Sequence, residues 1–194
     1  MKIEPVILEG EFARLEPLRI EHLEALYEIG ADETLWLWTA NIVKNFDDMK
    51  RYIETALDEF VRKISLPFVT IDKSKNKIVG STRFGNIDAK NRRTEIGWTW
   101  INPQWQKTSI NTEVKLLMLM HAFEKWNCIR VELKTDALNE KSRNAILRIG
   151  AKEEGILRQH MITEAGRFRD TVYFSILDKE WQNVKANLQA KLSR

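Results

Sequence analysis

The chain has 194 residues, of which 43% are hydrophobic and 30% are charged, so it is long enough for one substantial hydrophobic core. Its 31 basic and 28 acidic residues leave a formal net charge of only +3, and the basic residues are scattered. This excludes nucleic-acid binding as the default interpretation, because that function needs concentrated positive charge. We expect one domain over residues 1–194.

Membrane and metal functions also have no support in the sequence. No apolar run approaches the roughly 20 residues of a membrane span, and the first ten residues contain acids where a signal peptide would be apolar. The lone Cys128 permits neither an internal disulfide nor a cysteine-based metal site, and no two histidines have metal-ligand spacing. We therefore expect a cytoplasmic protein with no membrane partner and no bound metal.

The hydrophobic pattern predicts alternating strands and helices. In chain order we expect a strand over 9–18, helices over 19–29 and 47–64, strands over 68–72, 78–87 and 92–102, a helix from Thr108 or Asn111 to about 126, a strand over 129–135, a helix over 139–149, strands around 153–162 and 168–177, and a helix from 178 or 179. This order indicates an α+β or mixed α/β fold, in which helices cover a largely antiparallel sheet. Asp47 or Asp48 is expected to cap the second helix, and the aromatic segment 35–41 to form a loop or a short helix.

The polar loop before the long helix is the first candidate site. Residues 106–112, Q-K-T-S-I-N-T, supply amides, hydroxyls and one lysine at a helix N-terminus. Unpaired N–H groups and the helix dipole at such an end favour an anion, for example a phosphate. The sequence contains no P-loop and no dinucleotide-binding glycine motif. The alternative is an ordinary helix cap with Lys107 in solvent, and the loop alone does not decide between the two.

The segments around this loop carry a family resemblance. They are E-I-G-W-T-W-I-N-P at 95–103, Q-K-T-S-I-N at 106–111 with its apolar helix, and I-R-V-E-L-K-T-D-A-L-N-E-K-S-R-N-A-I-L-R-I-G-A at 129–151. Together they resemble the GNAT superfamily of N-acetyltransferases, and within it the RimJ/RimL-like branch of ribosomal-protein N-terminal acetyltransferases. The resemblance implies acetyl-CoA as the acetyl donor, a primary amine as the acceptor, and direct transfer in a ternary complex.

The resemblance also implies a cofactor site along this stretch. The family's pyrophosphate loop has the pattern Q/R-x-x-G-x-G/A, and its two small positions are held here by Ser109 and Asn111. We expect binding to be retained, because Ser is small and Asn tolerates left-handed backbone geometry. The pantetheine arm would pair with the backbone of the preceding strand, as an added strand extends a sheet. The residues expected to bind the cofactor are Trp100, Ile101, Asn102, Gln106, Lys107, Thr108, Ser109, Ile110, Asn111, Thr112 and Asn139.

Glu95 is the candidate general base. An alkylammonium has a pKa near 10, so a carboxylate acting directly or through water would help to remove its proton. Strand alternation places Glu95, Gly97 and Thr99 on one face and Ile96, Trp98 and Trp100 on the other, unless a bulge intervenes. The alternative is a surface carboxylate paired with Arg92 or Arg93.

Ser142 is the second candidate catalyst. Residues 139–142, N-E-K-S, match the family's N-x-x-S, which implies that Asn139 contacts the cofactor and that Ser142 protonates the departing thiolate. By spacing alone, Asn139 is a helix cap and Ser142 an ordinary helical residue.

The acceptor side is less defined. Trp36 and Trp38 could be packing residues, or they could wall the acceptor site, as the resemblance implies for this region; Arg169 and Asp170 could orient the acceptor. The sequence does not decide between a peptide N-terminus and a small amine, nor whether the chain forms a homodimer. Two alternatives remain open: an acetyltransferase of a small antibiotic, polyamine or amino-acid analogue, and a non-enzymatic CoA-binding or interaction module.

Overall fold

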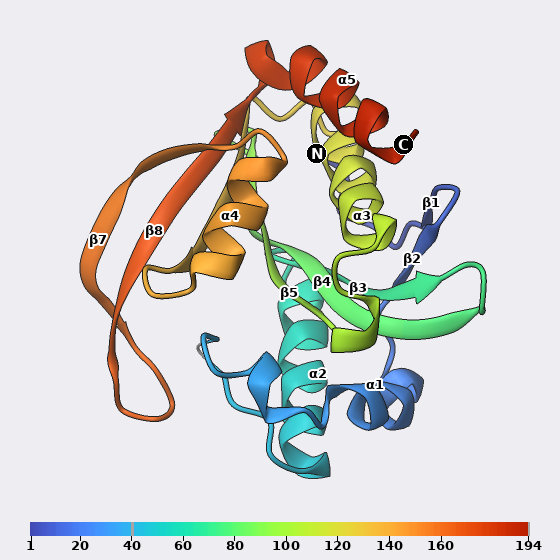
Figure 1. The fold of residues 1–194 in the computed structure, drawn as a ribbon, viewed down its shortest axis with the longest axis vertical. Helices are drawn as coiled ribbons and strands as arrows, with labels where there is room; N and C mark the ends of the chain where they lie inside the picture. The colour runs from blue at the N-terminus through green and yellow to red at the C-terminus, as the bar shows by residue number, and fades with distance from the viewer. Residues whose placement is uncertain (40, 194) are drawn as a thin grey trace.

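The computed structural model describes residues 1–39 and 41–193, and these are organised around one eight-stranded sheet (Figure 1). The strands lie in the order β1-β2-β3-β4-β5-β6-β8-β7, and every neighbouring pair is antiparallel except β5 and β6. The strands are β1 Leu8–Glu9, β2 Ala13–Pro17, β3 Leu66–Asp72, β4 Lys77–Asp88, β5 Arg93–Ile101, β6 Arg130–Asp136, β7 Lys152–Ile162 and β8 Phe168–Leu177. The predicted fold class, a largely antiparallel mixed sheet with helices, is confirmed.

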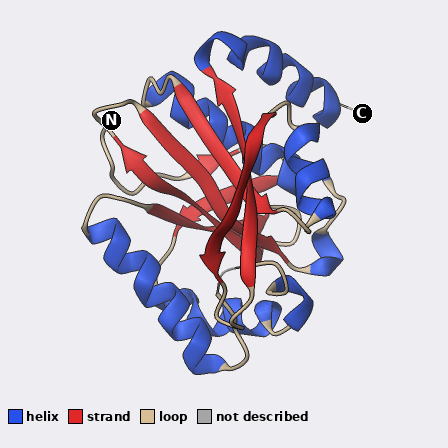
Figure 2. Ribbon diagram, turned by 90° about the vertical axis from the view of Figure 1, so that its left-hand side faces the viewer, coloured by secondary structure: helices blue, strands red, loops and turns tan. Residues whose placement is uncertain are grey.

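Helices cover both faces of this sheet (Figure 2). The helices are α1 Leu23–Gly30, α2 Phe46–Val61, α3 Ser109–Met120, α4 Glu140–Arg148 and α5 Trp181–Leu192. Two hydrophobic clusters fill the layers between helices and sheet. One joins α1 and α2 to β3 and to Trp100, and the other joins α3, α4 and α5 to the opposite face, through residues such as Val114 and Leu188. Each face of the sheet therefore has its own hydrophobic core.

The N-terminal strand is split into two. We predicted one strand over 9–18, whereas the chain bends between β1 and β2. The Glu113 carboxylate accepts hydrogen bonds from the N–H groups of Glu11, Phe12 and Ala13 at 2.8, 2.7 and 2.6 Å. These backbone groups turn toward a side chain of α3, and this contact is not visible in a local pattern.

The cap of α2 also differs from the prediction. Asn45, not Asp47 or Asp48, is the N-cap, and its Oδ1 accepts the N–H of Asp48 at 2.9 Å. The aromatic segment 35–41 follows a short 3-10 helix, Glu33–Leu35, and continues as turns. Residue 40 of that segment lies outside the described residues.

Strands β5 and β6 pair over only three residues and then diverge. Arg93–Glu95 pair with Arg130–Glu132, after which β6 continues to Asp136 beside β8. The β4–β5 register shifts in the same region, and Trp98 has a φ of 49°, as expected at a bulge. The divergence opens a gap in the middle of the sheet.

The bulge changes which side chains share a face. Ile96 packs in the cluster with α3, whereas Trp100 packs in the cluster with α1 and α2. The prediction that Ile96, Trp98 and Trp100 lie on one face is therefore wrong, because one extra residue reverses the alternation. The sequence analysis had allowed for a bulge in this strand, and the structure contains one.

The hairpin of β7 and β8 reaches beyond the body of the protein (Figure 1). Its exposed apolar side chains are Ile156, Leu157, Ile162 and Phe168.

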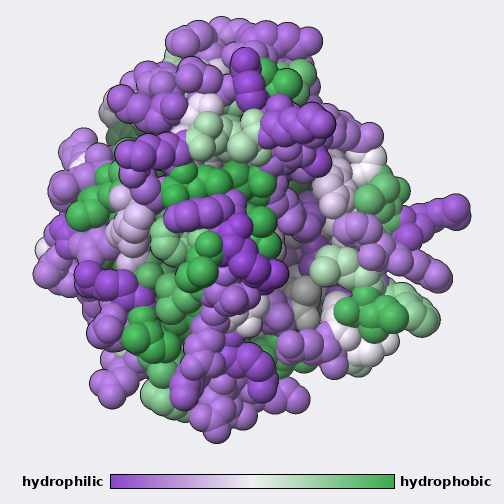
Figure 3. Space-filling view, turned by 180° about the vertical axis from the view of Figure 1, so that it is seen from behind, coloured by the Kyte–Doolittle hydropathy of each residue, from purple (hydrophilic) through white to green (hydrophobic). Residues whose placement is uncertain are grey.

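On the face opposite to Figure 1, hydrophobic side chains form separate patches between hydrophilic ones (Figure 3). Among the described helices, none has both the length and the apolarity needed to cross a bilayer.

Candidate active site

A cavity of about 270 Å³ lies at the gap between β5 and β6. Its walls come from the loop after α1, from α2, β5, β6, α3 and α4, and from the β7–β8 hairpin. Of the residues predicted for the site, those that line the cavity are Trp36, Trp38, Glu95, Trp100, Asn111, Asn139, Ser142 and Arg169. Those outside its lining are Ile101, Asn102, Gln106, Lys107, Thr108, Ser109, Ile110, Thr112 and Asp170.

Glu95 is a buried residue of the cavity wall and is only 2% exposed. Its Oε2 accepts a hydrogen bond from Asn86 Nδ2 at 2.8 Å and pairs with Lys134 Nζ at 3.0 Å. Its Oε1 lies over Gly97, where an added Cβ would approach it to 2.7 Å. The alternative of a surface carboxylate paired with Arg92 or Arg93 is wrong.

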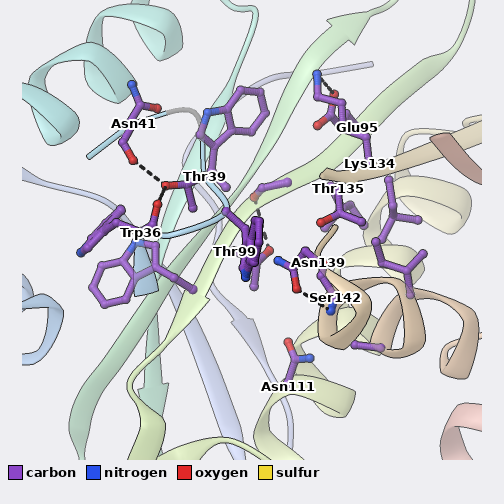
Figure 4. A pocket seen from close by; sticks show the side chains of 18 of the residues that line it. Trp36, Thr39, Asn41, Glu95, Thr99, Asn111, Lys134, Thr135, Asn139 and Ser142 are labelled. Atoms are coloured by element: carbon purple, nitrogen blue, oxygen red, sulfur yellow. Dashed lines mark hydrogen bonds and ion pairs between the residues drawn. The ribbon is translucent and has the colours of Figure 1, made fainter. Parts of the chain in front are cut away.

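Asn139 and Ser142 lie across the gap from Glu95, at the start of α4 (Figure 4). Asn139 is the N-cap of α4, and its Oδ1 accepts the N–H of Ser142 at 3.0 Å. The capping interpretation is thus correct, yet both residues line the cavity as well. Figure 4 shows the nitrogen end of the Asn139 side chain directed toward Thr99. One short motif therefore both starts the helix and faces the gap.

The side chains of the polar loop make hydrogen bonds within the loop, to the end of β5 and to α4. Gln106 donates to the Ile101 carbonyl at 2.8 Å and accepts a hydrogen bond from Lys141. Thr108 is the N-cap of α3 and donates to the Trp105 carbonyl at 2.8 Å. Lys107 is exposed and has a φ of 63°. The helix-cap alternative therefore describes Thr108 correctly, and Lys107 extends into solvent.

Ser109 and Asn111 both lie inside α3 and have no left-handed backbone. The residue that adopts left-handed geometry in this loop is Lys107, so tolerance of left-handed geometry at Asn111 was the wrong reason to expect binding. Asn111 instead faces the cavity, and its buried Oδ1 has no hydrogen-bond partner among the described residues. An unpaired buried acceptor on a cavity wall marks a place for a ligand donor.

Other residues of the predicted cofactor set have structural contacts. Ile110 packs in the hydrophobic cluster, and the Thr112 hydroxyl accepts a hydrogen bond from Arg148 of α4 at 2.7 Å. The N–H of Asn102 donates to the Val79 carbonyl at 2.9 Å. Backbone groups of alternate strand residues point the same way, so those of Trp100 also face β4 and those of Ile101 face the gap. The expected backbone pairing therefore remains possible only at Ile101.

Lys115 is a cavity residue that was not predicted from the sequence. It is 7% exposed, lies one helical turn after Asn111, and donates from Nζ to Thr99 Oγ1 at 2.7 Å. Burial lowers the pKa of this amine from 10.5 to about 7. Its signal in the sequence was a lysine in the middle of an apolar helix, within T-E-V-K-L-L.

The two tryptophans hold different places on the acceptor side. Trp36 is buried, donates from Nε1 to the Gly30 carbonyl at 2.9 Å, and packs against Tyr52 and Trp100. Trp38 is half-buried, and the Arg167 guanidinium lies 5.6 Å from its ring centroid. Both line the cavity, so packing and walling the cavity are compatible roles.

Arg169 and Asp170 are adjacent in β8 but have different surroundings. Arg169 is buried and lines the cavity, whereas Asp170 accepts the N–H of Gln159 at 2.7 Å and lies outside the lining. Of the two residues, only Arg169 therefore faces the cavity. No group of three His, Cys, Asp or Glu side chains within residues 1–39 and 41–193 is close enough to hold a metal ion.

Residues 13–152 match the family model described as an acetyltransferase (GNAT) domain. The chain belongs to the GNAT acetyltransferase family. It is 35% identical over 108 residues to a protein of Bacillus subtilis strain 168 named "Putative ribosomal N-acetyltransferase YdaF". That match covers 56% of this chain and 58% of the relative, so it spans less than two thirds of the relative's length.

Solved GNAT structures agree with this assignment. A GCN5-related N-acetyltransferase from Brucella melitensis is 32% identical, with a TM-score of 0.91, and the match covers 97% of this chain and 86% of that one. RimJ of Mycobacterium smegmatis, solved in complex with CoA-disulfide, is 22% identical, with a TM-score of 0.80 over 96% and 92% of the two chains, and shows the same fold. The resemblance to the GNAT family seen in the sequence is confirmed.

Proposed function

We propose that this GNAT protein transfers the acetyl group of acetyl-CoA to a primary amine, with both reactants held in the cavity between β5 and β6. The observation that carries the proposal is this cavity, where a buried carboxylate on one side faces the N-terminus of α4 on the other. Holding both reactants in one cleft removes much of the entropic barrier to their reaction. The complex of the RimJ neighbour with CoA-disulfide supports the same choice of donor.

The residues present fit a CoA thioester. Asn111 offers an unpaired buried acceptor, Ile101 directs backbone toward the gap, and Asn139 lies opposite on α4. Thr108 caps the Ile110 N–H, and the other N–H groups in the first turn of α3 lack partners within the helix and would be offered to a pyrophosphate. Bound acetyl-CoA would supply an acetyl group already activated as a thioester.

Glu95 is the general base in this proposal. Its Oε1 faces the space beside Gly97, while Asn86 and Lys134 hold its Oε2 in place. An acceptor ammonium in that space would transfer a proton to Oε1, directly or through one water, and become a nucleophilic amine.

Ser142 is the proton donor in this proposal. Its N–H is fixed by Asn139, and the residue lines the cavity at the first turn of α4. A hydroxyl there would give its proton to the thiolate that leaves and would take up the proton that the amine nitrogen loses as the amide forms. The positive end of the helix dipole would favour the same negative charge.

The acceptor in this proposal is the amine of a peptide N-terminus or of a small molecule. The name of the Bacillus relative favours a peptide. Trp36 and Trp38 wall this side of the cavity and would contact the acceptor's apolar part.

The test combines binding and turnover. Acetyl-CoA is titrated calorimetrically, and thiol release is then followed with a panel of peptides and amines. We expect binding and amine-dependent thiol release, a fall in turnover of roughly 10² or more for Glu95→Gln, and of about tenfold for Ser142→Ala. Glu54→Gln, on the exposed face of α2, is the matched control. Failure to bind acetyl-CoA at millimolar concentration would overturn the proposal, and unchanged turnover in both variants would overturn the two roles.

A further inference from the structure

Arg169 is a buried cation on the cavity wall that no carboxylate holds at hydrogen-bond distance. The residue is 6% exposed, and its Nε makes no hydrogen bond within the described residues. Asp136 Oδ2 lies 3.9 Å from that Nε, which is beyond hydrogen-bond distance. Thr171, two residues further along β8, has a buried hydroxyl that also lacks a partner among these residues. Two neighbouring polar groups are therefore unpaired.

The carboxylates near Arg169 are already bound to other cations. Asp136 pairs closely with Arg167, and Glu95 pairs with Lys134 at 3.0 Å. Two carboxylates, those of Asp136 and Glu95, thus lie among three cations. Arg167 and Lys134 each pair with one of them, whereas Arg169 lies within hydrogen-bond distance of neither. A buried charge is unfavourable unless it is paired and hydrogen-bonded. The unbalanced charge on this wall is positive, so the missing group is an anion.

The pKa of Arg169 follows from the same burial and the same neighbouring charges. Burial lowers the pKa of the Arg169 guanidinium from its ordinary value, and the charges of Asp136 and Glu95 oppose that shift only in part. Arginine nevertheless stays protonated in proteins, so the group keeps its charge and its planar set of donors. Such a fork matches the two oxygens of a carboxylate.

Arg169 shares its cavity with the proposed base. Both Arg169 and Glu95 line it, and the two are close enough for the carboxylate to influence the guanidinium. Met161, the β7 partner of Arg169, also lines the cavity. An acceptor with its amine at Glu95 would present its remaining atoms to Arg169.

We propose that Arg169 binds a carboxylate of the acceptor, so that the acceptor is a primary amine carrying a carboxylate a few bonds away. Free amino acids and peptides that begin with an acidic residue share this chemistry. The inference rests on the proposed function, because it takes the amine to lie at Glu95. It narrows the acceptor to anionic members of the amine class.

Matched acceptor pairs test this inference. One arm compares alanine with alaninamide, and the other compares C-terminally amidated tripeptides that begin with Asp or Asn and are otherwise identical. The value of kcat/KM is measured by thiol release at saturating acetyl-CoA. We expect the carboxylate member to be preferred at least tenfold in one arm, and that arm identifies the source. Equal or better use of the neutral members in both arms would overturn the inference.

Variants of the arginine localise the effect. Arg169→Gln should lower kcat/KM for the carboxylate member at least tenfold, mainly through KM, and change that of the neutral member less than twofold. Arg169→Lys keeps the charge and should recover part of the preference. Arg158→Gln removes an exposed arginine on β7 and should leave the preference intact. A preference that survives Arg169→Gln in folded protein would contradict the assignment.

A binding measurement separates this inference from the proposed function. The same compounds are offered to the CoA-loaded protein, and their binding is followed by ligand-observed NMR, which needs no turnover. Carboxylate members should bind and neutral members should bind at least tenfold more weakly. CoA binding with no discrimination, or with no acceptor bound, would overturn the carboxylate subsite alone. Absence of CoA binding would overturn the proposed function instead.

Discussion

Two faces of helix α3 each bury a charged side chain, and the two residues have opposite surroundings. On the face toward the N-terminal strands, Glu113 accepts three backbone N–H groups at 2.6 to 2.8 Å. On the face toward the cavity, Lys115 has one hydrogen bond, to Thr99, and lies one turn from the unpaired Asn111. Residues two positions apart on a helix point in different directions. Glu113 and Lys115 are therefore close in the sequence but contact different regions of the molecule.

The difference separates a charge that the protein itself satisfies from a charge that faces the cavity. Glu113 is satisfied entirely by the protein, and the backbone of residues 11–13 depends on it. Lys115 keeps donors directed at the cavity, and burial without a counter-ion lowers its pKa to about 7. Buried polar groups that the fold does not satisfy are retained at sites where a ligand satisfies them.

Removal of the Glu113 carboxylate should have the largest effect on stability. Glu113→Ala leaves three backbone N–H groups without their acceptor, and each buried unsatisfied donor costs about 1 to 3 kcal/mol. We expect the free energy of unfolding, measured by urea titration, to fall by about 3 kcal/mol or more. Glu54→Ala, on the exposed face of α2, should stay within about 0.5 kcal/mol of the parent. A loss as small as that of the control would show that Glu113 has no special role.

The pH dependence of stability tests the surroundings of Lys115. The unfolded chain keeps a lysine pKa near 10.5, whereas the folded pKa is about 7, so between these values the unfolded state binds more protons. The free energy of unfolding should therefore rise with pH in this window, by up to about 1.4 kcal/mol per unit. The cost of neutralising the buried amine is absent above pH 10.5. It grows as the pH falls to about 7, and the free energy of unfolding falls with it.

Comparison with Lys115→Met isolates that contribution. Urea titrations of both proteins at pH 7, 8 and 9 should show the parent gaining stability relative to the variant as the pH rises. Parallel curves would mean that the amine titrates normally and that the two faces of α3 do not differ as described.

Ligand binding should respond to Lys115 and not to a surface lysine. Lys115→Met keeps a flexible side chain of similar length but removes the donors, so the dissociation constant for acetyl-CoA should rise about tenfold, the effect of one lost hydrogen bond. The urea midpoint at pH 7 should not fall. Lys125→Met, which removes an exposed lysine, is the control for charge. A lower urea midpoint together with an unchanged dissociation constant for acetyl-CoA would show that Lys115 has a structural role, as Glu113 does.

The smallest effect is expected at Thr99. Its hydroxyl accepts from Lys115 and bonds to Thr82 at 2.7 Å, so Thr99→Val should lower the free energy of unfolding by about 1 kcal/mol. The loss should be smaller in the Lys115→Met background, because the two residues interact. Urea titrations of the four proteins in this double-mutant cycle measure that difference. Equal losses in both backgrounds would show that the pair is not coupled.

Much of the candidate site was predictable from local pattern. Asn139 and Ser142 were identified by the family resemblance and Glu95 by the need for a base, and all three line the cavity. The loop before α3 was predicted less well, because residues 106–110 mostly bond to their own loop and to the end of β5. Lys115 was missed because its apolar neighbours made the helix read as core, although a lysine there was itself a signal.

By itself, the sequence determined the order of strands and helices, because apolar periodicity and helix caps are local properties of the chain. It also carried the family motifs, which are contiguous. Only the tertiary structure decided the split of the first strand, the bulge at Trp98, and the partners of Glu113, Lys115 and Arg169. The physical reason is distance along the chain. The Glu113 carboxylate binds the N–H of Glu11, which is 102 positions away in the sequence. The periodicity of apolar residues does not indicate which backbone groups lack a partner in a neighbouring strand.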